Sequence, residues 1–274
     1  MPSVKELAKR LKGVTSTAKI TKAMKMVAAS GLRRAENTMN AARPFAASVN
    51  ELMMPHLGLK EDDKIESAVT LAISSDKGLC GGINARVVKA VKLMDADFEA
   101  AGVSSRLLLL GSKGRDGLMR THGKIIAESY DEAYKGPVTF SLASFLAEQM
   151  LANPADSYNV VFNKFQSVIS FDVQTTTMKG PEVLGESGKF DEFEFEGEKE
   201  DVLANLYQFN LACTIYGCLL ENVTSELASR MTAMDSASNN AKDMIGKLQL
   251  SYNRLRQAKI TTELTEIVAG AESV

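Results

Sequence analysis

The sequence LASRMTAMDSASNNAKDMIGKLQLSYNRL, residues 227–255, sets the architecture of this chain. Its apolar positions recur at alternating spacings of four and three residues, the pattern of a helix that packs along another helix. The nine register positions are Leu227, Met231, Met234, Ser238, Ala241, Ile245, Leu248, Tyr252 and Leu255, and all but Ser238 are apolar. No proline follows Pro181, so we expect one helix over residues 202–274, about 70 residues and roughly 100 Å long. A helix of that length must project from any compact domain.

A second long helix is predicted at the N-terminal end. Ser3 and Glu6 have the spacing of a capping box, and no residue that breaks a helix follows until Pro44. A register with spacings of three and four residues runs along this segment as well. Its twelve members are Val4, Leu7, Leu11, Val14, Ala18, Thr21, Lys25, Ala28, Leu32, Ala35, Met39 and Ala42, and all but Thr21 and Lys25 are apolar. The pattern predicts the seam of a coiled coil, with small residues that permit close approach.

Both registers change along their length. Thr21 and Lys25 interrupt the N-terminal seam, while Ile20, Met24 and Val27 form a second apolar stripe. This local shift implies that the helix changes its packing partner partway along. Beyond residue 255 the C-terminal register slips to a different apolar set, Ile260, Leu264, Ile267 and Val268.

The middle of the chain, residues 64–198, has the pattern of an α/β domain. Strands are expected at 68–74, 106–111, 124–129, 158–165, 167–177 and 193–195, and helices at 84–100 and 140–151. Alternation of strands with helices predicts a layered sheet, and the consecutive strands after residue 157 predict an antiparallel edge. The chain therefore divides into an N-terminal helix (1–60), a central domain (64–198) and a C-terminal helix (202–274).

Charge is segregated along a nearly neutral chain, which has 32 Lys and Arg against 34 Asp and Glu. Residues 1–43 carry ten basic and two acidic side chains, a net charge of +8, whereas residues 186–201 carry eight acids and two lysines, a net charge of −6. Either the basic end meets an acidic partner surface, or it is a solvated helix face. The overall balance argues against a dedicated nucleic-acid binder.

Several chemical functions lack the residues they need. The three cysteines, Cys80, Cys213 and Cys218, show no metal-binding spacing and are too few for a disulfide framework, so we expect a reducing compartment. The histidines, His56 and His122, are isolated, which argues against a zinc cluster and a Ser-His-Asp triad. No cofactor or metal is therefore predicted.

Targeting and membrane segments are not predicted either. The most apolar run, residues 209–220, contains an asparagine, a threonine and a glycine, so we expect no membrane span. The start MPSVKELAKR lacks the apolar core of a signal peptide and is not an obvious transit peptide.

Two glycine-rich segments raise the question of phosphate binding. Residues 78–82, GLCGG, follow a strand and open a helix, but their spacing differs from GxGxxG, and no acid follows the second strand to hold a ribose. We expect a tight turn that contacts a partner, with a nucleotide site as the alternative. Residues 111–117, GSKGRDG, are expected to form a plain loop, the alternative being a phosphate cradle. Cys80 lies close to Lys77 without a general base nearby in sequence, so we expect an inert thiol.

Four segments carry a resemblance to a known family. KITKAMKMVAAS (19–30), SSDKGLCGG (74–82), SRMTAMDSASNNAKDM (229–244) and YNRLRQAKITTELTEIVAGA (252–271) resemble the gamma subunits of rotary (F-type) ATP synthases. These motifs occur in order over essentially the full length. FNKFQSVIS (162–170) and the short loops are most similar to mitochondrial members. The regulatory cysteine insert of chloroplast members is absent, so thiol control of that kind is not expected.

The resemblance implies a fold and a function. The terminal helices would form a long antiparallel coiled coil flanking a central Rossmann-like α/β domain that binds no nucleotide. The coil would enter a hexamer of alternating nucleotide-binding alpha and beta subunits, and the α/β domain would contact the small central-stalk subunit and the membrane rotor ring. Rotation driven by protons would turn this shaft and cycle the catalytic sites, so the chain itself would perform no chemistry.

The resemblance also implies contact residues. Residues expected to contact the catalytic ring are Met24, Lys25, Lys77, Arg230, Gln257, Thr261 and Glu263. Met24 and Arg230 would lie near the acidic lever of a catalytic subunit, and the last three would form a polar catch deeper in the ring. An apolar bearing is expected at the helix tip: Ile260, Leu264 and Ile267.

Location and alternatives follow from the same reading. The matrix side of the mitochondrial inner membrane is expected, with the cytoplasmic face of a bacterial plasma membrane as the alternative. A coiled-coil scaffold or adaptor with an α/β interaction domain is the competing function. An enzyme would need the ligand-binding glycine motif and the catalytic groups that are missing.

Overall fold

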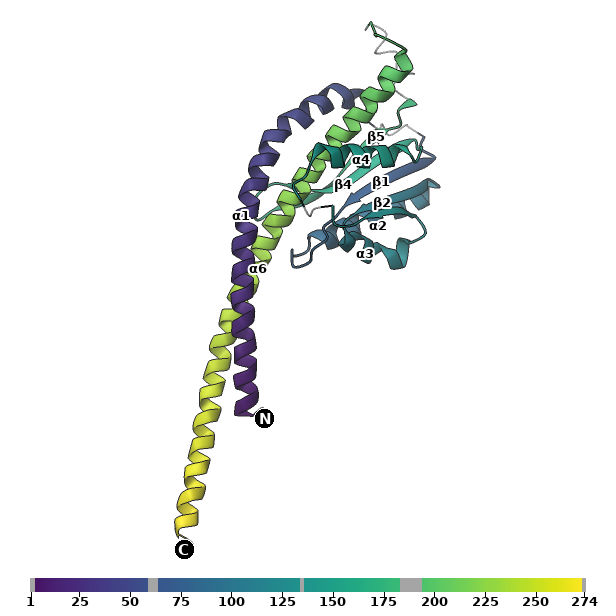
Figure 1. Ribbon diagram of the computed structural model, residues 1–274. Helices are drawn as coiled ribbons and strands as arrows, with labels where there is room; N and C mark the ends of the chain where they lie inside the picture. The colour runs from purple at the N-terminus through teal and green to yellow at the C-terminus, as the bar shows by residue number, and fades with distance from the viewer. Residues whose placement is uncertain (1–2, 59–63, 134–135, 183–193, 273–274) are drawn as a thin grey trace. The chain divides into compact units, whose positions relative to one another are not determined.

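The computed structural model describes residues 3–58, 64–133, 136–182 and 194–272. Its helices are α1 (Val4–Leu57), α2 (Ile83–Ala101), α3 (Ser112–His122), α4 (Phe140–Leu151) and α6 (Lys199–Glu272) (Figure 1). Its strands are β1 (Ser67–Ile73), β2 (Ser104–Leu110), β3 (Ile126–Tyr130), β4 (Ser157–Phe165) and β5 (Phe171–Lys179). The chain forms two compact units, a coil unit (residues 1–28 and 231–274) and an α/β unit (residues 29–230).

The coil unit is an antiparallel pair of helices, as Figure 1 shows by the two chain ends lying at the same end of it. Every predicted seam position of this unit from residue 4 to 28 and from 231 to 255 is buried or half-buried. The polar members follow the same rule, since Thr21 is 8% exposed and Ser238 is 5% exposed. Lys25 Nζ lies 2.7 Å from Asp235 Oδ1 and joins the two helices. The predicted coiled coil is confirmed.

Apolar side chains remain uncovered on the coil unit. In the second stripe Ile20 is 59% exposed and Val27 is 73% exposed. Every residue from Arg256 to Ala271 is exposed, including Leu264 at 58% and Ile267 at 67%. The coil therefore presents apolar surface that the chain itself does not bury.

The α/β unit is built on a five-stranded sheet of order β3-β2-β1-β4-β5. The first four strands are parallel, and β5 runs antiparallel to β4, from Ser157↔Lys179 to Phe165↔Phe171. The predicted parallel sheet with an antiparallel edge is confirmed. Because β1 lies at the centre, its carboxyl end is the point at which such sheets bind ligands.

Two apolar layers cover the sheet. Leu71 and Ile73 of β1 and Leu108 of β2 pack against α4 and α6 in one layer, and Met53 of α1 joins them. On the opposite face, small and branched residues of the strands pack against α2 and α3. The strand residues are Ala72, Leu107, Leu109 and Val161, and the helix residues are Val87, Val91 and Leu118. Alternate residues of one strand thus serve both layers, which explains the near-continuous apolar runs in β1 and β2.

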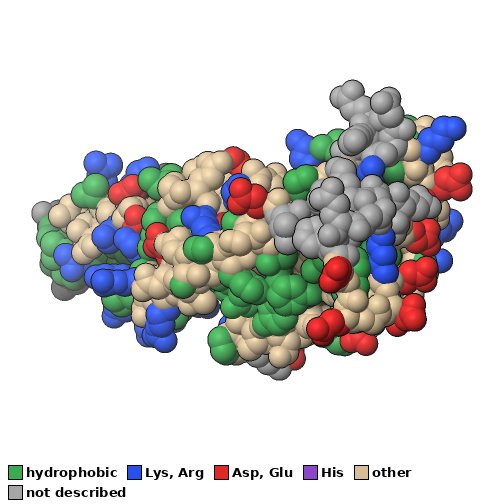
Figure 2. Space-filling model, turned by 90° about the horizontal axis from the view of Figure 1, so that it is seen from above, with side chains coloured by type: hydrophobic (Ala, Val, Ile, Leu, Met, Phe, Trp, Pro, Cys, Tyr) green, Lys and Arg blue, Asp and Glu red, His purple; other side chains and the backbone are tan. Residues whose placement is uncertain are grey.

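An aromatic cluster lies at the surface of this unit. The ring of Phe45 is 6.2 Å from that of Phe140 and 6.3 Å from that of Phe209, both in edge contact. Phe45 and Phe209 are each 44% exposed. The face of the molecule seen in Figure 2 carries a patch of hydrophobic side chains.

Helix α1 continues through Pro44 and Pro55, beyond the break expected at the first of these prolines. A proline inside a helix removes one backbone hydrogen bond and crowds the preceding turn. The apolar register nevertheless continues in steps of seven through Met39, Ala46 and Met53, which are at most 9% exposed. Burial of this continuous face outweighs the local cost.

The loop predicted at residues 111–117 is wrong, because Ser112–His122 is helix α3. Gly111 adopts a φ of 97° before the helix, and a Cβ on Gly114 would lie 2.6 Å from Ser74 Oγ. These glycines permit close approach, and fully buried Leu118 anchors the helix. Burial of that side chain overrides the poor helix propensity of glycine.

Strand boundaries differ in two places. Residues 167–170 form the turn before β5, in which Ser170 N–H donates to Ser167 O at 3.2 Å, so the strand begins at Phe171. The short strand expected at 193–195 is wrong for Glu194 and Phe195, which lie in no strand, and Phe193 lies outside the described residues.

Candidate functional site

The carboxyl edge of the parallel strands is the place to test for a ligand, and its anion position is already occupied. Helix α3 begins there, and a helix N-terminus attracts anions. The Ser112 N–H donates to Asp76 Oδ1 at 3.0 Å, so a carboxylate takes the place that a phosphate would use. A second anion would meet like charge, which disfavours the phosphate cradle considered for residues 111–117.

The loop after β1 uses its polar groups internally. Ser75 N–H donates to Asn84 Oδ1 at 3.0 Å, and Asn84 Nδ2 donates to Ser75 Oγ at 2.8 Å. The Cys80 carbonyl accepts from Ser229 Oγ of α6 at 2.6 Å. The loop is thus fastened both to itself and to α6, as expected for a structural turn rather than for a pyrophosphate-binding loop.

A charged cavity of about 750 Å³ lies beside this loop. It is lined by Asp76, Lys77, Ser112, Asp131, Glu132, Val223, Glu226, Leu227 and Arg230. Two of the predicted ring contacts, Lys77 and Arg230, meet here although they are far apart in sequence. The structure adds acids that the sequence did not identify, and among them Glu226 could have been found from its spacing of four residues to Arg230 on one helix.

Glu226 and Arg230 form an ion pair within α6. Their side chains are 9% and 12% exposed, so the pair is largely desolvated. Burial raises the pKa of Glu226, and the Arg230 cation opposes that shift. Arg230 is therefore already committed to a partner within the chain, although it also lines the cavity.

The cysteines are buried thiols. Burial raises the pKa of Cys80, which is 2% exposed, and raises the pKa of Cys213 to about 11. Burial also raises the pKa of Cys218. A raised pKa keeps the thiol protonated and weakly nucleophilic. Lys77 does not activate Cys80, in line with the inert thiol predicted there.

The remaining predicted contacts lie in the coil unit. Met24 is half-buried, and Lys25 is paired with Asp235. Farther along, Gln257, Thr261 and Glu263 are exposed; the last lies 3.4 Å from Lys259 in an ion pair along the helix. The tip residues Ile260, Leu264 and Ile267 are exposed as well and lie in the same stretch of α6.

The occupied anion position leads to a prediction about nucleotides. We expect the isolated chain to show no saturable binding of ATP or NAD at millimolar ligand, because Asp76 repels phosphate at the start of α3. Isothermal titration calorimetry of the full chain measures this directly. A stoichiometric site that survives the addition of magnesium and salt would contradict the prediction.

The described residues also bear on metal binding and on membrane insertion. Across the described ranges, no group of three or more His, Cys, Asp or Glu side chains is arranged to hold a metal ion. In the same residues, no helix is both long enough and apolar enough to cross a bilayer.

Comparison with known proteins identifies the family. The model of the ATP synthase family matches residues 3–274. The chain is 39% identical to the ATP synthase gamma chain of Rhodospirillum rubrum, with both chains covered fully. It is 40% identical to the mitochondrial ATP synthase subunit gamma of Ipomoea batatas, over 99% of this chain and 85% of that protein.

Solved structures agree with the sequence relatives. A chain of the Euglena gracilis mitochondrial ATP synthase matches with a TM-score of 0.81 at 19% identity, over 98% of this chain and 94% of that one. A chain of the central stalk and c-ring structure from Tetrahymena thermophila matches with a TM-score of 0.68 at 29% identity, over 80% and 99%. The helical seam, the α/β unit and these relatives agree, and the chain belongs to the ATP synthase gamma-chain family.

Proposed function

We propose that this chain is the central-stalk rotor shaft of a proton-translocating ATP synthase. It couples rotation of the membrane ring to the conformational cycle of the catalytic subunits, and it carries no catalytic site of its own. The observation that supports this most directly is the uncovered apolar surface of the coil unit, at Ile20, Val27 and the stretch from residue 256 to 271. A two-helix coil with such a surface requires a surrounding partner.

The proposed partners follow from the family. They are the hexamer of alternating alpha and beta subunits, the small central-stalk subunit and the membrane rotor ring, without nucleic acid. Relatives occur in mitochondria and in bacteria. We place the chain on the matrix side of the mitochondrial inner membrane, the bacterial cytoplasmic face being the alternative. The scaffold or adaptor function is disfavoured by the family match over residues 3–274.

The contact residues are part of the proposal. Met24 and Arg230 would face the acidic lever of a catalytic subunit, and Lys25 and Lys77 would contact the catalytic ring. Lys25 and Arg230 already hold partners within the chain, so each would share its charge as the rotor passes. The exposed Lys25–Asp235 pair contributes about 0–1 kcal/mol, weak enough to exchange during rotation, whereas the buried Arg230–Glu226 pair stays in place. A polar catch at Gln257, Thr261 and Glu263 obeys the same reasoning. The division into segments 1–60, 64–198 and 202–274 likewise remains a prediction.

The bearing tip provides the test of this function. Replacing Ile260, Leu264 and Ile267 together by serine should leave the stability of the isolated chain unchanged, because all three are exposed. In the complex the loss of burial, about 1 kcal/mol for each side chain, should weaken retention of the shaft on the order of 100-fold. Dissociation from the catalytic hexamer, followed by size-exclusion chromatography at decreasing concentration, measures the effect.

A matched variant and a decisive outcome complete this experiment. Thr262→Ser with Thr265→Ser changes neighbouring exposed positions, removes only one methyl group at each and should behave nearly as the unmodified chain. If the triple serine variant is retained as tightly as this control, the tip is not a bearing. If the unmodified chain fails to bind the hexamer at all, the shaft function itself is refuted.

A further inference from the structure

Strand β4 extends beyond the strand beside it. β1 pairs with β4 only as far as Ala72↔Val161, whereas β4 continues to Phe165. The last residues of β4 pair with β5 up to Phe165↔Phe171. Where β1 has ended, side chains from the two long helices bond to the backbone of β4 instead.

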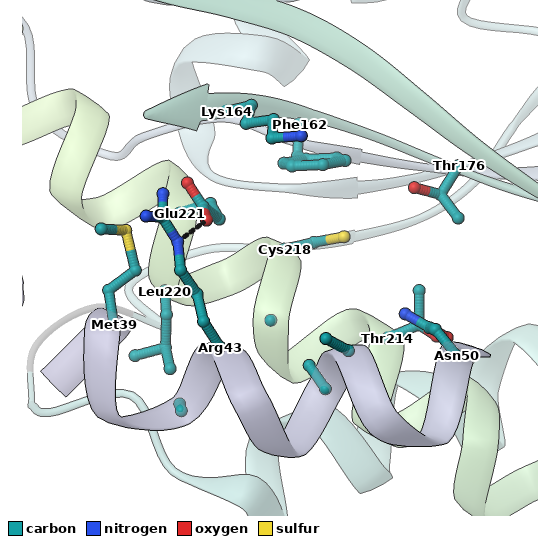
Figure 3. Close-up of a pocket in the computed structure, with 14 residues that line it drawn as sticks. Met39, Arg43, Asn50, Phe162, Lys164, Thr176, Thr214, Cys218, Leu220 and Glu221 are labelled. Carbon is teal, nitrogen blue, oxygen red and sulfur yellow. Dashed lines mark hydrogen bonds and ion pairs between the residues drawn. The ribbon is translucent and has the colours of Figure 1, made fainter. Parts of the chain in front are cut away.

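Arg43 and Glu221 make these bonds together. Arg43 Nε of α1 donates to Glu221 Oε1 of α6 at 2.8 Å, and Arg43 Nη2 donates to the Phe165 carbonyl at 3.2 Å. The Phe165 N–H donates to Glu221 Oε2 at 2.8 Å, which closes the ring. We refer to Arg43, Glu221 and the Phe165 backbone as the three-element joint. Figure 3 shows Arg43 rising from α1 to meet Glu221.

Other polar contacts attach β4 to α6 but leave α1 out. Ser225 Oγ donates to the Asn163 carbonyl at 3.1 Å, and Asn163 Nδ2 donates to Asn222 Oδ1 at 2.7 Å. Farther along, Thr214 Oγ1 of α6 donates to Asn50 Oδ1 of α1 at 2.7 Å without involving the sheet. Among the described residues, Arg43 of α1 thus donates a side-chain hydrogen bond directly to the backbone of β4.

A cavity makes this link important. About 480 Å³ of space lies between α1, the β4–β5 pair and α6, bounded by small residues such as Ala42, Ala46 and Gly217 (Figure 3). Packing between α1 and the strands is therefore thin at this level, although Met53 joins the core farther along α1. Glu221 is 9% exposed, so its charge depends on the Arg43 guanidinium and the Phe165 amide.

We propose that the three-element joint transmits torque from the sheet to both long helices, with Arg43 and Glu221 as positioning residues for rotary coupling. This inference rests on the proposed shaft function. A load applied to the α/β unit must reach α1 as well as α6, or the two helices would slide along each other. The planar guanidinium fork, holding a carboxylate and a carbonyl at once, resists such sliding in a way that a single charge contact does not.

Arg43→Met is the informative change, because it keeps the apolar stem and removes the donors. In the assembled complex in vesicles, ATP hydrolysis without a gradient should stay within about twofold of the unmodified complex, whereas ATP synthesis against a load should fall several-fold. Amide exchange at Phe165 in the full chain should accelerate on the order of 10-fold, as expected for loosening one hydrogen-bonded site. Lys164→Met, at an exposed residue lining the same cavity, is the matched control and should change neither.

A charge exchange separates the joint from a simple ion pair between helices. The double variant Arg43→Glu with Glu221→Arg restores opposite charges but places donors against the Phe165 N–H and an acceptor against its carbonyl. We expect no rescue of synthesis. Rescue, or equal losses of synthesis and hydrolysis in Arg43→Met, or no loss of either, would overturn the proposal. Failure of the unmodified complex to couple would instead refute the shaft function.

Discussion

Gly111→Ala is expected to destabilise the α/β unit by about 3 kcal/mol. Gly111 has a φ of 97°, a conformation that costs other residues about 1–3 kcal/mol. A Cβ would also lie 2.7 Å from Ser74 Oγ and 2.8 Å from the Ser74 backbone. The backbone cannot move aside, because Ser74 N–H donates to the Leu110 carbonyl at 2.8 Å. Overpacking of this kind adds about 1–3 kcal/mol. Urea unfolding followed by circular dichroism measures the loss.

Gly82→Ala is the matched control for this loss. Gly82 has a φ of −94°, and a Cβ there would meet no atom within 4 Å. The free energy of unfolding of the Gly82→Ala variant should differ from that of the unmodified chain by less than about 0.5 kcal/mol. Equal effects of the two substitutions would show that the approach of Gly111 to Ser74 is not as tight as described.

The long helices were predictable because their periodicity alone specifies which face is buried. Even polar residues in register, such as Thr21 and Ser238, are buried, since position on the helix outweighs side-chain polarity. The same rule accounts for the passage of α1 through Pro44, because the heptad spacing of Met39, Ala46 and Met53 keeps one face buried beyond the proline.

Helix α3 shows what local patterns cannot supply. Its glycines are necessary because Ser74 and Val88 approach them, and those neighbours are about 30 to 40 residues away in sequence. A pattern search therefore sees only a glycine-rich loop. The buried Leu118 is the one local sign of an ordered helix, and a single apolar residue does not distinguish a helix from a loop.

Only the cations of the candidate site were predictable from the sequence. The cations Lys77 and Arg230 followed from the family resemblance, but the acids that face them depend on tertiary structure. Asp76 caps a helix that begins 36 residues later, at Ser112. The three-element joint is more remote still, since Arg43 and Glu221 are 178 residues apart. Contacts of this range carry no periodic signal in the sequence.

Arg230→Met is expected to destabilise the α/β unit by about 3 kcal/mol at neutral pH, because it leaves the buried Glu226 carboxylate without its cation. Burial raises the pKa of Glu226 above its ordinary value of 4.5, so the folded chain binds this proton more tightly than the unfolded chain. The contribution of Glu226 to stability is therefore greatest below that ordinary value and falls as the pH rises through the pKa of the folded state. Without Arg230 the pKa of Glu226 in the folded chain rises further, which widens the pH range over which stability falls.

The pH dependence distinguishes this mechanism from lost packing. In Arg230→Met the loss should be clearly smaller at about pH 5 than at neutral pH, because a larger share of Glu226 is protonated in the folded chain at the lower pH. Adding Glu226→Gln should recover most of the stability and remove the extra pH dependence, because a neutral amide of similar size needs no cation. Urea unfolding of the single and double variants at both pH values provides the comparison. A loss that is equal at both pH values and persists in the double variant would mean that Arg230 acts through the packing of its stem, and the account of Glu226 as a buried charge held by Arg230 would be wrong.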